Sequence, residues 1–366
     1  MTASILSSSL VSPLGIGSQE NFTAIRDGIS AITLIDDTAL SSVPFYGAQI
    51  NSFIEDVGLT RFEYLSVRSI EDALQKCNEA IDLEKTILVF ATTKGNIDLL
   101  GGEDRGNPGL FLHTAADRIA RRIGVKKSTV VSNACTSGVM AVILAKCLVE
   151  NKNFDHAIVT GTDVLSRFVV SGFQSLHALS DGPCKPFDAD RKGLNLGEAS
   201  ATLILSTTHK TEYRVLGYGA TNDSNHISGP SRTGEELSLA IKRALVDSQL
   251  GINEIDFISA HGTATLYNDE MEAKAFNHAG LGHVPVNSLK GYFGHTLGAA
   301  GLVETVMSLQ SLMQNELLAT KGFDKHGVSL PLNVVTHPEK RQMKTFLKTA
   351  SGFGGCNAAL IVSKEL

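Results

Sequence analysis

Residues 128–150, STVVSNACTSGVMAVILAKCLVE, run from a β-branched segment through a small polar turn into a helix of small and apolar residues. Residues 284–312, VPVNSLKGYFGHTLGAAGLVETVMSLQSL, repeat this order. Both expected helices are apolar nearly all round, which is typical of helices that are buried on every side. Two such helices predict a duplicated α/β chain with an N-terminal half, 1–210, and a C-terminal half, 211–366.

Short apolar runs alternate with helical stretches on both sides of these two segments. Candidate buried strands are 86–91, 128–132, 157–160, 202–205, 257–260 and 359–362, after a first strand near the N-terminus. Candidate helices are 70–80, 139–150 and 237–248. This alternation predicts an α/β fold with largely buried sheets.

The composition narrows the class of protein. With 43% hydrophobic and 19% charged residues, the 366-residue chain can bury a large core. The net charge of −6 and the scattered basic residues argue against a nucleic-acid partner. Five cysteines without CxxC spacing predict neither a metal site nor a disulfide framework, and they suit a reducing cytoplasm. No apolar run approaches the ~18 residues of a membrane span, and the N-terminus lacks the basic start of a signal peptide.

Cys135 lies in the turn between the first expected strand–helix pair. Backbone N–H groups and the helix dipole at a helix N-terminus favour a thiolate. Free cysteines are, however, among the most buried residues of proteins. The turn alone therefore leaves a reactive nucleophile and a core cysteine as equal alternatives.

Two histidines lie at comparable junctions. His261 follows an expected strand, and His295 comes directly before the second apolar helix. Two neutral imidazoles that donate N–H bonds could stabilise a thioester carbonyl or an enolate oxygen. Glu304 is the charged exception in that helix, so we expect it to form a buried pair with Lys290, although an orientation towards solvent stays open.

The C-terminal segment SGFGGCNAAL, 351–360, is a glycine-rich turn before the last strand. A backbone N–H in such a turn could contribute to an oxyanion hole, and a simple tight turn is the alternative.

As a set, six ordered motifs resemble those of the β-ketoacyl-acyl carrier protein synthases of the elongating Cys-His-His type, which have the thiolase-like fold. The motifs are LVSPLGIGSQENFTAIRDGISAI (10–32), NACTSG (133–138), CKPFDADRKGLNLGEASA (184–201), HGTATLYNDEMEA (261–273), KGYFGHTLGAAGLVE (290–304) and SGFGGCNAAL (351–360). The resemblance covers essentially the whole chain. It implies two pseudo-symmetric halves in an α-β-α-β-α arrangement.

The resemblance also implies an activity: decarboxylative Claisen condensation of an acyl group on Cys135 with a malonyl-acyl carrier protein, in fatty acid or polyketide/polyene synthesis. His261 and His295 would drive decarboxylation, and the backbone amides of Cys135 and Phe353 would form the oxyanion hole, with Phe353 also acting as a gate. No tightly bound cofactor is implied, because substrates travel on the phosphopantetheine of an acyl carrier protein. The expected assembly is a homodimer, or a heterodimer with a related synthase-like subunit.

Further residues receive roles only through this resemblance. Lys290 would organise the site, and the other expected members of the site are the supporting Glu304, Asp269 and Glu272 and the pantetheine-binding Thr263, Thr265 and Ser228.

Several positions depart from the family pattern. Asn133 replaces the usual Thr, Ser351 a second Phe and Cys356 a Thr, and the stretch from Lys94 to Thr129 is short. The acyl length, extender and pathway therefore do not follow from the resemblance. A degradative thiolase, a Cys-His hydrolase and a scaffold subunit without turnover are the alternatives.

Overall fold

The computed structural model describes residues 2–51, 58–101, 106–224 and 229–365. Its main sheet has the strand order β14-β12-β11-β16-β17-β10-β1-β9-β7-β5-β6, and β2 (Gly15–Ile16) pairs with β1. The N-terminal strands are β1 (Ser4–Ser12), β5 (Thr86–Ala91), β6 (Lys127–Val131), β7 (His156–Asp163) and β9 (Ala199–Ser206). The C-terminal strands are β10 (Tyr213–Asn222), β11 (Phe257–Ser259), β12 (Pro285–Asn287), β14 (Asn333–Val334), β16 (Thr345–Gly352) and β17 (Cys356–Lys364).

The two ends of this sheet repeat one topology. Across the sheet from β6 to β1, the neighbouring strands are the third, second, fourth, fifth and first of the N-terminal half in chain order. From β12 to β10, the strands of the C-terminal half follow the same order. In each set the first three strands across the sheet are parallel to one another, and the remaining two run antiparallel to their neighbours. β1 and β10 join the sets through Ser4 opposite Arg214. The boundary near residue 210 remains a prediction that this repetition supports.

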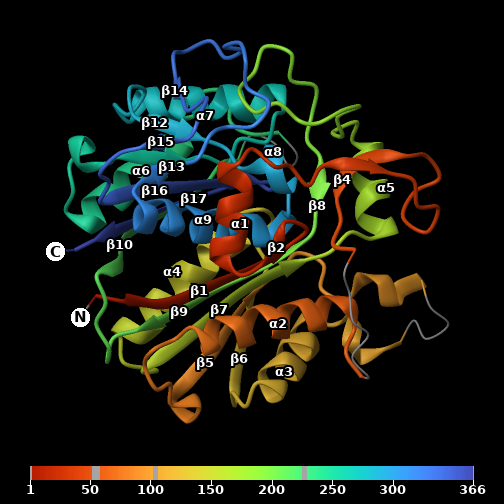
Figure 1. The fold of residues 1–366 in the computed structure, drawn as a ribbon, viewed down its shortest axis with the longest axis vertical. Helices are drawn as coiled ribbons and strands as arrows, with labels where there is room; N and C mark the ends of the chain where they lie inside the picture. The colour runs from red at the N-terminus through yellow and green to blue at the C-terminus, as the bar shows by residue number, and fades with distance from the viewer. Residues whose placement is uncertain (1, 52–57, 102–105, 225–228, 366) are drawn as a thin grey trace.

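Five layers stack across the molecule (Figure 1). α4 (Ser137–Glu150) and α9 (Ala300–Gln314) form the central layer, since each packs on strands of both halves. α2 (Arg61–Gln75) and α3 (Leu112–Arg122) cover the N-terminal strands, while α6 (Glu235–Ser248) packs on β10 and β17 and carries α7 (Leu266–His278) beside it. The predicted α-β-α-β-α arrangement is confirmed.

Shorter elements complete the fold. They are α1 (Ser18–Arg26), α5 (Arg167–Ser175), α8 (Lys290–Phe293), the sheet of β3 (Thr33–Ile35), β4 (Phe45–Ala48) and β8 (Leu196–Gly197), and the pair β13 (Glu316–Leu317) and β15 (Glu339–Lys340). Among the helices of the described ranges, none has both the length and the apolar character needed to cross a bilayer.

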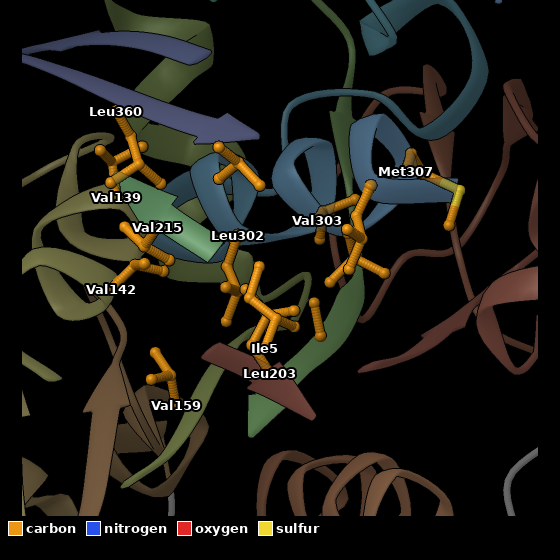
Figure 2. Close-up of a cluster of buried hydrophobic side chains, with 14 of the residues drawn as sticks. Ile5, Val139, Val142, Val159, Leu203, Val215, Leu302, Val303, Met307 and Leu360 are labelled. Carbon is orange, nitrogen blue, oxygen red and sulfur yellow. The ribbon is translucent and has the colours of Figure 1, made fainter. Parts of the chain in front are cut away.

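The central helices carry the core. Figure 2 shows Val139 and Val142 of α4 and Leu302, Val303 and Met307 of α9 among side chains from strands of both halves. Every residue of α9 from 300 to 312 is buried, as its all-round apolar character predicts. Close approach of the helices requires Gly138, because a Cβ there would lie 2.6 Å from the backbone N of Leu302.

All six predicted strands overlap observed strands, and the helices predicted at 139–150 and 237–248 begin two residues earlier, at Ser137 and Glu235. The third predicted helix differs at both ends. α2 begins at Arg61 instead of Ile70 and ends at Gln75 instead of Ala80. It starts early because Thr60 caps it: its hydroxyl accepts from the Glu63 amide while the Glu63 carboxylate accepts from the Thr60 amide. It ends where the following polar residues lie mostly exposed.

Candidate active site

Cys135 lies in a turn that its own neighbours fix. The Ser137 hydroxyl donates to the Ala134 carbonyl at 2.6 Å and accepts from the Asn133 amide at 2.8 Å. α4 begins at Ser137. Cys135 therefore lies immediately before the helix N-terminus, and its side chain lines a pocket.

The loop that carries His261 is held by a buried carboxylate from α7. Glu272 accepts from the backbone amides of His261 at 2.7 Å and Gly262 at 2.6 Å. It also accepts from the side chains of Asn268 and Thr349. Glu272 thus fixes the course of the histidine loop through its backbone.

The loop that carries His295 is held from the other half of the molecule. The His295 amide donates to the Asn195 carbonyl at 2.6 Å. Asp163, at the end of β7, accepts from the Gly298 amide at 2.7 Å and from the Thr93 amide at 3.2 Å. Asp163 therefore connects the start of the central helix to the loop after β5.

Each of these three loops contains one non-glycine residue with positive φ. The angles are +45° at Ala134, +61° at Ala264 and +51° at Leu297. Such conformations cost on the order of 1–3 kcal/mol each and persist only where the surroundings enforce them. Their coincidence with Cys135, His261 and His295 indicates a site that tertiary contacts hold in place.

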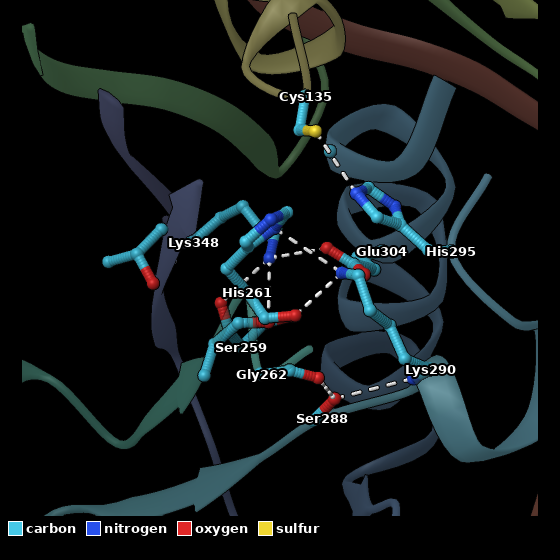
Figure 3. Close-up of polar contacts among 12 residues, drawn as sticks. Cys135, Ser259, His261, Gly262, Ser288, Lys290, His295, Glu304 and Lys348 are labelled. Carbon is cyan, nitrogen blue, oxygen red and sulfur yellow. Dashed lines mark hydrogen bonds and ion pairs between the residues drawn. The ribbon is translucent and has the colours of Figure 1, made fainter. Parts of the chain in front are cut away.

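The three candidate side chains of Cys135, His261 and His295 line one pocket and lie close together in it (Figure 3). The Cys135 Sγ lies 3.0 Å from Nε2 of His295. The rings of His261 and His295 pack edge to face with centroids 5.2 Å apart. Residues 126 and 34 positions apart along the chain thus form one constellation.

Beneath the imidazoles lies a buried ionic triad of Lys290, Glu304 and Lys348. The Nζ of Lys290 contacts Oε1 of Glu304 at 2.5 Å, and that of Lys348 contacts Oε2 at 2.6 Å. Lys290 also donates to the His261 carbonyl at 2.6 Å and lies 3.3 Å from its Nδ1. The predicted Lys290–Glu304 pair is confirmed, and the orientation of Glu304 towards solvent is excluded.

Burial shifts the pKa values of Cys135 and of both histidines. Burial raises the pKa of the Cys135 thiol to about 12, although Lys290 acts in the opposite direction. This effect of burial opposes the helix N-terminus, which favours a thiolate. Burial, and then the charge of Lys290, hold the pKa values of His261 and His295 well below 6.5, so both rings are neutral at pH 7.

The glycine-rich turn lies directly against the cysteine loop. A Cβ on Gly352 would lie 2.9 Å from the backbone N of Cys135. The next residue, Phe353, is 42% exposed and stacks on Phe173 of α5 with ring centroids 6.1 Å apart. Cys356 lies behind the turn, where its Sγ is 3.5 Å from the Asn133 carbonyl.

The expected pantetheine-binding residues fall into two groups. Thr263 and Thr265 line the pocket and share a hydrogen bond of 2.8 Å between their hydroxyls. Ser228 lies outside the described residues.

Asp269, expected as a supporting residue of the site, contacts the segment before the His295 loop in the chain, residues 184–201. Its Oδ2 accepts from the Phe187 amide at 2.7 Å and lies 3.7 Å from Nε of Arg191. These partners belong to the 184–201 motif, and the supporting role of Asp269 stays a prediction.

Sequence reasoning missed Lys348 and Asp163. Both are buried and both contact the loops that carry the histidines. Lys348 had a visible signal, since it is the one charged residue of the otherwise uncharged strand segment TFLKTASG. Asp163 ends a strand and had no comparable signal.

Within the described ranges, Cys135, His261 and His295 form the one group of His, Cys, Asp and Glu side chains whose donor atoms, all within 4.8 Å, could hold a metal ion. The ammonium groups of Lys290 and Lys348 lie beneath this group. These positive charges stabilise an anion that develops in the pocket and disfavour a bound cation. The thiolase-like layers and this Cys-His-His constellation define a thioester-forming acyltransferase of the condensing class.

Comparison with known proteins agrees with this class. Residues 93–211 match the family "Beta-ketoacyl synthase, N-terminal domain", and residues 213–324 match "Beta-ketoacyl synthase, C-terminal domain". The chain belongs to the beta-ketoacyl synthase family.

Individual relatives support the assignment. A 3-oxoacyl-[acyl-carrier-protein] synthase 2 of Coxiella burnetii is 30% identical over 277 residues, which are 70% of this chain and 67% of the relative. That of Rhizobium meliloti is 31% identical over 70% of this chain, and the match spans about two thirds (66%) of its length. The Vibrio cholerae enzyme of the same name is 25% identical over 97% of both chains.

Among solved structures, a ketosynthase in complex with its chain length factor from Xenorhabdus doucetiae is similar over 99% of this chain and 98% of the matched chain. The TM-score is 0.90, with 25% sequence identity.

Proposed function

We propose that this chain joins an acyl group carried on Cys135 to a malonyl unit carried by an acyl carrier protein, with loss of CO2 and formation of a β-ketoacyl-acyl carrier protein. The observation that carries the proposal is the contact of 3.0 Å between the Cys135 sulfur and His295, beside His261 and above the buried ammonium groups. No tightly bound cofactor enters this reaction, because both substrates arrive as thioesters.

In the first half-reaction Cys135 takes the acyl group. The thiol has a raised pKa, so its proton must leave as the sulfur attacks, and Nε2 of His295 is the nearest acceptor. A C–S bond forms to the acyl carbonyl, the C–S bond to pantetheine breaks, and His295 returns the proton to the departing thiolate. Nδ1 of His295 has no partner among the described residues, so no contact locks the tautomer.

In the second half-reaction the malonyl thioester loses CO2. The electrons of the broken C–C bond move onto the thioester oxygen as an enolate, which needs stabilisation but no strong base. Lys290 can only donate to Nδ1 of His261, which leaves the proton of the neutral ring on Nε2. Nε2–H groups of His261 and His295 are the proposed donors to this oxygen. The enolate carbon then attacks the acyl-Cys135 carbonyl, and the Cys135 sulfur leaves as a thiolate, which takes up one proton from solvent to restore the thiol.

We assign the oxyanion hole for acyl-Cys135 to the backbone amides of Cys135 and Phe353, since the glycine-rich turn lies against the cysteine loop. Phe353 is also the proposed gate, because its half-exposed ring covers the pocket and rests on Phe173. Thr263 and Thr265 are proposed to bind the pantetheine arm.

The proposed partners are an acyl carrier protein and a second synthase-like subunit, either a copy of this chain or a related chain. Within the described part of the chain, β6 ends the sheet and pairs only with β5. Such an open edge suits pairing across a dimer interface. A cytoplasmic location is proposed with these partners.

Mass spectrometry tests the assignment. After incubation with acyl-acyl carrier proteins of several chain lengths, the wild type and Cys147→Ser should gain one acyl group, and Cys135→Ala should gain none. Cys147 is the control because it is half-buried and contacts Tyr218, away from the histidines. If no donor acylates Cys135, the chain is not a condensing enzyme. Free acid as the main product would indicate a hydrolase.

A further inference from the structure

The second lysine of the buried triad has no place in the mechanism described so far. Lys348 is fully buried in β16, and its Nζ is saturated by three oxygen acceptors. It donates to the carbonyls of Ser259 and Ala260, both at 3.0 Å, and pairs with Glu304 at 2.6 Å. Burying a lysine is costly unless its charge is matched, so this arrangement calls for an explanation.

The contacts of Lys348 lead directly to His261. Ser259 ends β11 and Ala260 is the residue before His261, so the ammonium holds the backbone from which that imidazole extends. β16 and β11 are parallel neighbours, with Lys348 opposite Ser259. The position of the ammonium is therefore set by the sheet itself.

The triad is also unbalanced in charge. One carboxylate, Glu304, is shared by two ammonium groups, each on its own oxygen. A pair of Lys290 and Glu304 alone would be neutral, whereas the triad carries one net positive charge. The other charged or titratable groups around His261 are Glu272 of α7, His295 and Cys135. The carboxylate of Glu272 accepts four hydrogen bonds and attracts Lys348, but it is not among the groups that shift the pKa of His261 or His295.

We propose that Lys348 is a positioning residue for the condensation: it fixes the strand end before His261 and, through Glu304, makes the charge beneath both imidazoles positive. The proposal rests on the proposed function and adds to it a residue that does not touch the substrate. A positive charge at this place keeps the imidazoles from accepting protons and stabilises negative charge that develops on the thioester oxygen.

The direction of the histidine shifts agrees with this geometry. After burial and Lys290, Lys348 is among the groups that lower the pKa of His261 and of His295. Removing its charge while leaving the fold intact should therefore raise both values. Because only the neutral rings can act as proposed, the activity should then fail at a higher pH than in the wild type.

The experiment compares Lys348→Gln, which removes the charge but keeps an N–H donor, with Lys348→Arg, which keeps the charge. Lys146→Gln is the matched control, because Lys146 is also a buried lysine with a carboxylate partner, Glu150, but lies near the C-terminal end of α4, the end opposite to Cys135. Histidine ring resonances are followed by NMR from pH 4.5 to 8 in the full chain. His261→Asn and His295→Asn variants identify the two signals among the 11 histidines.

In the wild type both signals should titrate well below pH 6.5 or not at all. Lys348→Gln should raise the midpoint of at least one by about one pH unit, and Lys348→Arg and Lys146→Gln should leave both in place. Unchanged midpoints in a folded Lys348→Gln would overturn the proposal. If that variant does not fold, Lys348→Met takes its place, because it also removes the charge and keeps a long side chain: raised midpoints support the proposal, and unchanged midpoints overturn it.

A second readout follows malonyl decarboxylation against pH. The acidic limb in Lys348→Gln should move up by the same amount, while acylation of Cys135 at pH 8 stays within about twofold of the wild type. A purely structural role for Lys348 would reduce both steps together and leave the limb in place. The NMR titration requires no turnover, so failure of the proposed condensation and failure of the Lys348 proposal are distinguishable.

Discussion

Replacing Glu304 with Gln tests how much the buried ion pairs of the site contribute to the stability of the fold. The side chain keeps its shape, but the carboxylate between Lys290 and Lys348, at 2.5 and 2.6 Å, disappears. Breaking one buried ion pair costs about 3–5 kcal/mol, because the partner charge stays buried. Two ammonium groups depend on this one carboxylate. We therefore expect the free energy of unfolding at pH 7 to fall by about 3–5 kcal/mol.

The loss should depend on pH in a defined direction. Burial already lowers the pKa of Lys348 below 10.5, and Glu304 opposes that effect. Without the carboxylate the folded pKa falls further, so the unfolded chain binds more protons than the folded chain. The free energy of unfolding should then rise with pH between the folded pKa and 10.5.

Urea unfolding of the wild type and Glu304→Gln at pH 7 and at pH 9.5 measures both effects. Glu84→Gln is the control, because Glu84 pairs with Lys126 at the similar distance of 2.6 Å but both side chains are more than 60% exposed. It should lose less than about 1 kcal/mol. A loss below 1 kcal/mol in Glu304→Gln, or an equal loss at the two pH values, would refute the argument.

The remaining predictions concern the nucleophile, its histidine neighbour and the helix crossing. His295→Ala should lose malonyl decarboxylation while Cys135 still accepts an acyl group, more slowly; normal CO2 release would contradict the role of His295. Because the pKa of Cys135 is raised to about 12, its alkylation by iodoacetamide should keep accelerating up to pH 10, and a plateau below pH 8 would count against this. Gly138→Ala should destabilise the fold by about 1–3 kcal/mol through its contact with Leu302, measured by urea unfolding. Gly172→Ala, in a helix and with open space around it, should be neutral or stabilising.

The local sequence determined most of the elements. Strand 86–91 was predicted with its observed ends, because a short β-branched apolar run between polar residues has few alternatives. The start of α2 was missed although Thr60 and Glu63 form a recognisable capping box. The predicted range, 70–80, overlaps only the C-terminal part of this helix.

Cys135, His261 and His295 could be found from the sequence because each lies at a junction between elements, within a recognisable motif. Their separation of 3.0 Å between sulfur and nitrogen, and of 5.2 Å between rings, could not be found, since residues far apart in the chain set it. The effect of burial on the Cys135 thiol could not be found for the same reason. A helix N-terminus is visible in a sequence, whereas the burial that raises the pKa of Cys135 is not.

The sequence by itself thus determined the α/β class and the two central helices and pointed to the residues proposed to react, because periodicity and local motifs encode them. Only the tertiary structure decided what lies beneath those side chains. Lys348 is four residues from the end of a β-strand segment and 44 residues from Glu304 in the chain, and parallel pairing of β16 with β11 brings its ammonium beneath His261. Charge balance in a buried site is a sum over contacts between distant segments, so it exists only once the chain has folded.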